Sequence, residues 1–202
     1  MTRFRLSRAC LPLAVIAVLA FAPVSAQDVK LAAEDAAILR AAIDGVRPQM
    51  RLEQRPSTTL LIFDRTIAIC PSGQSYPREM GCLGSEISRL STAFKNDLQE
   101  PVRAEMRRSF LELNKSSVGV PPQAIAGVAI ATPAEIASKF DPNTGRGALH
   151  VTVSMPGKSS DGGAIVYVSY WCGNLCAYGW FVLVQKTADG WRAVANELLW
   201  IS

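Results

Sequence analysis

Residues 149–202, LHVTVSMPGKSSDGGAIVYVSYWCGNLCAYGWFVLVQKTADGWRAVANELLWIS, are the stretch that decides the fold. Four segments in this stretch have the composition of β-strands and are joined by short turns: Leu149–Met155, Ala164–Trp171, Tyr178–Lys186 and Trp191–Ile201. The first alternates apolar and polar residues, which is the period-two pattern of a strand. Asp189-Gly190 is a hairpin turn signal. The pattern therefore predicts an antiparallel meander of about four strands.

The two middle strands are apolar on both faces, so both faces of the predicted sheet need a cover. In Ala164–Trp171, one face carries Ile165, Tyr167 and Trp171, and the other carries Ala164, Val166, Val168 and Tyr170. Helices can cover one face. The second face must curve around a cavity, meet another subunit or pack on more of the chain.

The earlier part of the chain adds helices and one more strand. The apolar spacing predicts helices over 32–46 and over 86–112, the latter interrupted near Pro101. Residues 58–69 are rich in β-branched and apolar side chains and predict a strand. A short helix over 132–140 is predicted from its cap, Thr132, with Pro133 and Glu135 behind it. The expected fold class is α+β, with helices packed on the C-terminal meander.

The N-terminus has the order of a secretory signal peptide. Arg3, Arg5 and Arg8 precede an apolar run from Cys10 to Phe21, and small residues end at Ala26. The run is short for a membrane-spanning helix, which needs about 20 apolar residues. We therefore expect cleavage after Ala26, an exported protein that is periplasmic or secreted, and a mature chain, 27–202, that folds as one α+β domain without a membrane span.

The charge of the mature chain gives no reason to expect nucleic-acid binding. The full chain has 21 basic and 17 acidic residues, and residues 1–26 carry three of the basic ones and no acid. The mature chain is therefore nearly neutral, whereas nucleic-acid binding relies on concentrated positive charge.

Four cysteines remain after cleavage: Cys70, Cys82, Cys172 and Cys176. An even number in an oxidising compartment predicts two disulfides, with three possible pairings. We favour Cys70–Cys82 and Cys172–Cys176, because the members of each pair are close in sequence and flanked by turn residues. Thiol redox catalysis is disfavoured, since three residues separate Cys172 from Cys176 where redox motifs have two. Zinc is disfavoured by the spacing and the compartment. No metal and no cofactor is expected.

The run YWCGNLCAYGW (Tyr170–Trp180), FVLVQK, Gly190-Trp191 and the terminal LLWIS (Leu198–Ser202) resemble a group of uncharacterised exported bacterial proteins. These proteins carry a CG-x-LC-like hairpin tip and end near WIS. The stretch LLIFDRT (Leu60–Thr66) is similar to their first strand. The resemblance implies no activity. Asp189-Gly190-Trp191-Arg192 before a last strand is also similar to the end of NTF2-like and cystatin-like α+β folds.

No residue is predicted to be catalytic. His150 is the only histidine and lies on the polar face of an alternating strand, where it needs no functional role. The motifs Gly-x-Ser-x-Gly and Ser-x-x-Lys are absent from the sequence. The aromatic residues around the last hairpin are either core packing or a ligand or partner surface. The candidate surface residues are Tyr170, Trp171, Tyr178 and Trp180.

These observations favour an exported envelope protein that acts as a non-catalytic module and binds a partner protein or an apolar small ligand. The alternative is a hydrolase whose site is assembled from residues distant in sequence. A third class, a structural or inhibitor-like protein, would show neither a polar cleft nor an apolar pocket. The sequence leaves the oligomeric state open.

Overall fold

The computed structural model describes residues 31–50, 60–70, 81–94, 103–139, 149–173 and 176–202. The predicted signal peptide, 1–26, lies outside this part of the chain. The described helices are α1 (Ala33–Val46), the 3-10 helix η1 (Arg47–Met50), α2 (Glu86–Arg89), α3 (Ala104–Leu113) and α4 (Pro133–Ser138). The described strands are β1 (Leu61–Phe63), β2 (Ala129–Ala131), β3 (His150–Val153), β4 (Gly157–Lys158), β5 (Gly163–Gly173), β6 (Cys176–Thr187) and β7 (Gly190–Ile201). The fold class is α+β, as predicted.

The strands form one mixed sheet in the order β2-β1-β3-β5-β6-β7, with β4 also paired to β5. The C-terminal meander is confirmed, because β3, β5, β6 and β7 are joined by antiparallel pairing. The parallel part was not predicted. β1 lies between β2 and β3 and runs parallel to both, with Leu61 opposite Ala129 on one side and His150 on the other.

The strand predicted over 58–69 is shorter in the structure. Regular pairing is confined to β1, and residues 58–59 lie outside the described part. Beyond Phe63 the chain makes single bridges to three different partners, Arg65 to Gly119, Ile67 to Ser154 and Ile69 to Leu83. Thr66, Ile67 and Ala68 are buried, but the segment does not remain beside one neighbour, so it makes no continuous ladder.

The helix predicted over 86–112 is two shorter helices, α2 and α3, and residues 95–102 between them lie outside the described part. The short helix predicted over 132–140 is α4, where the Thr132 side chain accepts a hydrogen bond from the backbone of Glu135 and the Glu135 carboxylate accepts one from the backbone of Thr132. Such reciprocal caps stabilise a helix start that would otherwise leave its N–H groups unpaired.

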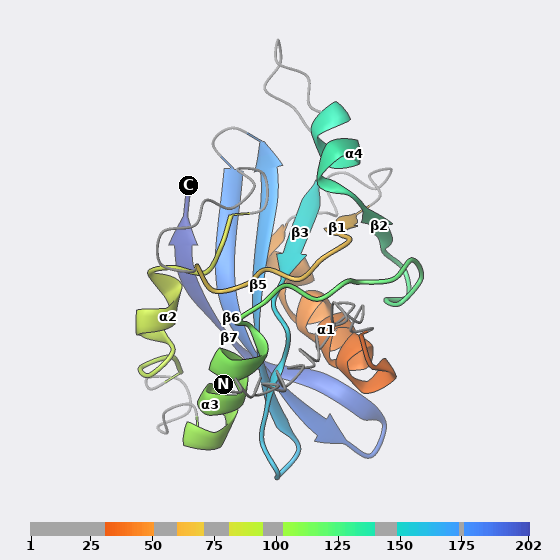
Figure 1. Ribbon diagram of the computed structural model, residues 1–202. Helices are drawn as coiled ribbons and strands as arrows, with labels where there is room; N and C mark the ends of the chain where they lie inside the picture. The colour runs from red at the N-terminus through yellow and green to blue at the C-terminus, as the bar shows by residue number, and fades with distance from the viewer. Residues whose placement is uncertain (1–30, 51–59, 71–80, 95–102, 140–148, 174–175) are drawn as a thin grey trace, which may run out of the picture.

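Strands that are apolar on both faces need a cover on each face, and helices of the same chain provide both covers. On one face, α1 packs on β5, β6 and β7. On the other face, α2 and α3 pack over the same strands, as Figure 1 shows. The close approach of α3 depends on Gly157 in β4, where an added Cβ would overlap Phe110 and the carbonyl of Met106.

Both favoured disulfides are present in the structure. Cys70 pairs with Cys82 and Cys172 with Cys176, with Cα–Cα distances of 5.0 and 5.1 Å, which are normal for disulfides. The second bond joins β5 to β6 at the tip of their hairpin. Within the described ranges no helix combines the length and apolar character that crossing a bilayer would require.

Candidate functional site

A pocket of about 240 Å³ opens on the sheet face that α2 and α3 cover. Its lining comes from Ile67 after β1, from the segment around α2, and from the strands β3, β5, β6 and β7 of the C-terminal meander. The lining includes four tyrosine or tryptophan residues, Tyr167, Tyr170, Trp171 and Trp200, and four polar residues, Glu86, His150, Thr152 and Ser169.

The register of β3 against β5 positions the floor of the pocket. His150 lies opposite Trp171, and Thr152 lies opposite Ser169. The His150 ring stacks on the Trp171 ring with centroids 5.0 Å apart and meets the edge of Phe63 at 5.1 Å. These aromatic contacts restrict the orientation of both rings, so this part of the pocket is preformed.

A second aromatic pair forms another wall. The indole Nε1 of Trp200 donates a hydrogen bond to the hydroxyl of Tyr167 at 3.2 Å. The Trp200 indole lies directly over Gly179 of β6, where an added Cβ would overlap the ring. Burial, with a smaller contribution from the charge of Glu86, raises the pKa of Tyr167 far above its usual value. The phenol therefore remains neutral at physiological pH.

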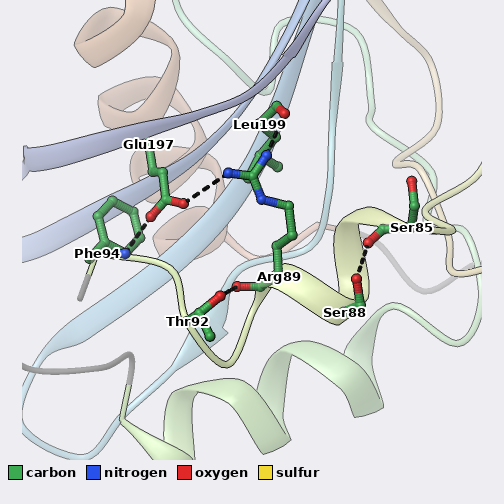
Figure 2. Close-up of polar contacts among 7 residues, drawn as sticks. All are labelled: Ser85, Ser88, Arg89, Thr92, Phe94, Glu197 and Leu199. Atoms are coloured by element: carbon green, nitrogen blue, oxygen red, sulfur yellow. Dashed lines mark hydrogen bonds and ion pairs between the residues drawn. The ribbon is translucent and has the colours of Figure 1, made fainter. Parts of the chain in front are cut away.

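The segment that carries Glu86 is anchored to β7 by three polar contacts, two from Arg89 and one from the Phe94 backbone, which Figure 2 shows. The Arg89 guanidinium donates to the carbonyl of Leu199 and lies 3.4 Å from the Glu197 carboxylate. The other oxygen of that carboxylate accepts the backbone N–H of Phe94, which has a left-handed φ of 64°. This conformation is uncommon for a residue other than glycine, and the Glu197 contact stabilises the turn that adopts it.

Both disulfides lie at the border of the pocket. Cys82 is part of the lining. The hairpin bond is flanked by two lining residues, because Trp171 precedes Cys172 and Ala177 follows Cys176. The two bonds therefore each restrain residues at the rim, which adds a local role to their general effect on the unfolded chain.

The structure places the four candidate surface residues on two different faces of the sheet. Trp171 is half-buried in the pocket. Tyr170 belongs to the core under α1 and also borders the pocket. Trp180 is buried on the α1 face, and Tyr178 stacks against it with centroids 5.6 Å apart. Trp180 is therefore core packing, and the four residues do not form one surface.

Sequence reasoning missed Glu86, Ser169 and Trp200 as pocket residues. The alternation in β5 contained the signal for Ser169, because it places that residue on the same face as Tyr167 and Trp171. For Glu86 and Trp200 no comparable signal exists, since their helix and strand meet the others only in three dimensions.

The described residues contain no group of three or more histidine, cysteine or carboxylate side chains that could hold a metal ion. Comparison with protein families, with curated proteins and with solved structures found no match. The resemblance to NTF2-like folds and to the WIS-ending group therefore stays a prediction.

Proposed function

We propose that this protein is an exported binding module that holds a small organic ligand in the pocket between α2 and the sheet. The observation that carries the proposal is the pocket itself, a preformed cavity with aromatic walls and a few polar groups. Binding pockets generally combine these features. Its volume of about 240 Å³ is below the roughly 300–1,000 Å³ of pockets for drug-sized molecules, so it suits a small ligand.

The hydrolase alternative has one observation in its favour, because His150, Ser169 and Glu86 line the same pocket. The surroundings of Ser169 favour binding over nucleophilic attack. Its hydroxyl interacts with the phenol of Tyr167, which has no basic character while it is protonated. A serine nucleophile needs a general base that accepts its proton. Hydrolysis of p-nitrophenyl acetate that is lost in His150→Ala would support the hydrolase instead.

The four tryptophans of the chain provide a direct test of ligand binding. Trp171 and Trp200 line the pocket, whereas Trp180 is buried under α1 and Trp191 lies beside Lys186. In a titration with aromatic, aliphatic, cationic and anionic fragments followed by NMR, we expect some fragments to shift the indole N–H signals of Trp171 and Trp200. The signals of Trp180 and Trp191 should remain in place.

Trp171→Ala should abolish that binding, because it removes one aromatic wall, and Trp191→Ala is the matched control that should retain it. The Trp180 signal reports in both variants whether the core is intact. If no fragment shifts the Trp171 and Trp200 signals at millimolar concentration, the proposed function is wrong.

Export is the second part of the proposal, and it is supported by the signal pattern of residues 1–26 together with the two disulfides. Intact-mass measurement on protein from the cell envelope should give a chain that starts at Gln27, with or without cyclisation of that residue. A mass that retains residues 1–26 would contradict it.

A further inference from the structure

The described lining of the pocket contains one acidic side chain, the carboxylate of Glu86. No lysine or arginine is found among the lining residues that the structure describes. His150 is the other group that can carry charge, and its ring is stacked on Trp171. Among the described lining residues, the Glu86 carboxylate therefore has no lysine or arginine to balance it.

The position of Glu86 leaves its carboxylate able to interact with a ligand in the pocket. One carboxylate oxygen accepts the backbone N–H of Gly84 at 3.0 Å, which holds the side chain at the start of α2. The basic residue one turn later, Arg89, is directed to Glu197 and to the Leu199 carbonyl on β7 (Figure 2). Among the described residues no ion pair to Glu86 is found.

The aromatic lining supplies the second half of a cation site. The rings of Tyr167, Trp171 and Trp200 border the same cavity as the carboxylate. The faces of aromatic rings are electron-rich and attract ammonium groups within about 6 Å, most strongly where water is excluded. Because Tyr167 is a neutral phenol hydrogen-bonded to Trp200, it adds a ring without adding a charge.

From this combination we infer that the pocket binds a small organic cation, an ammonium group on a compact apolar body, with the aromatic rings around the ammonium and Glu86 as its counter-ion. This inference rests on the proposed function and names its ligand class. An anionic ligand would meet the Glu86 carboxylate, and a neutral one would leave that charge unused.

The test compares choline with dimethylbutanol, in which a carbon atom replaces the quaternary nitrogen, so that the two probes share a shape and differ in charge. Binding is measured by the shifts of the Trp171 and Trp200 indole signals. We expect choline to bind about tenfold more tightly than the alcohol, an advantage that combines ring attraction with the charge of Glu86. The choline affinity should fall as salt is added.

Glu86→Gln should reduce the choline affinity about fivefold and leave the affinity for dimethylbutanol unchanged. Glu112→Gln is the matched control, because Glu112 is an exposed carboxylate on α3 that pairs with Lys115. Unchanged Trp180 and Trp191 signals show that each variant is folded.

The outcomes separate the two proposals. Equal affinity for choline and the alcohol, or equal choline affinity in Glu86→Gln and the parent protein, overturns the cation inference and leaves a binding pocket. Binding of fragments of another class without choline binding also overturns the cation inference and leaves a binding pocket. Absence of binding by choline, the alcohol and the whole fragment set overturns the proposed function as well.

Discussion

Replacing Phe110 by alanine should lower the free energy of unfolding by about 3–5 kcal/mol, the usual cost of removing a buried aromatic ring from a core. Phe110 is fully buried and meets Phe181 of β6 edge-on with ring centroids 5.8 Å apart. The Phe110 backbone lies so close to Gly157 that α3 has little freedom to move inward and fill the space. Urea unfolding followed by circular dichroism measures the loss.

Leu113→Ala is the control for this prediction, because Leu113 lies on the same helix and is 40% exposed. It should cost less than about 1 kcal/mol, since little apolar area is lost from the core. Similar losses in the two variants would mean that α3 does not cover the second face of the sheet.

Replacing Gly179 by alanine should weaken binding in the pocket by more than about tenfold and destabilise the fold by about 1–3 kcal/mol, because inserting atoms into a packed site forces its neighbours to move. The added methyl group would overlap the Trp200 indole, which has to leave its hydrogen bond with Tyr167. The Trp200 indole signal should therefore shift before any ligand is added, and choline titration gives the change in affinity.

Gly119→Ala is the control for Gly179→Ala. No atom lies within 4 Å of a Cβ built at Gly119, and its φ is outside the left-handed region. Its stability should stay within about 0.5 kcal/mol of the parent, as for most surface substitutions, and its affinity should not change. Normal binding by Gly179→Ala would show that the position of Trp200 is irrelevant to the pocket.

The parts of the fold that the sequence predicted are those with strong local signals. Strand-like composition and the Asp189-Gly190 turn predicted β6 and β7 close to their observed limits, and the Thr132 cap predicted the start of α4. The parallel strands have no such signal. β2 is three residues, Ala129–Ala131, with low strand propensity, and it is held in the sheet by its pairing with β1.

The candidate site was also predictable only in part, because only some of its residues have a local signal in the sequence. Trp171 and His150 attract attention in the sequence because one is aromatic and the other is the single histidine. Their stacking follows from the β3–β5 register, which alternation alone does not specify. Glu86 resembles any acidic residue at a helix start, and it becomes a pocket residue only because Arg89 and Phe94 connect its segment to Glu197.

The place of β1 between β2 and β3 implies an order of folding. Leu61 is paired with Ala129 and His150, two residues far along the chain, whereas β5, β6 and β7 are neighbours in sequence. Closing long loops costs entropy that short hairpins avoid, so strands with distant partners are incorporated late. We expect the C-terminal meander to form first and the N-terminal strand to insert at its edge before β2 adds outside it. A ribosome-bound chain that lacks residues 149–202 would then have no neighbouring strand with which β1 could pair.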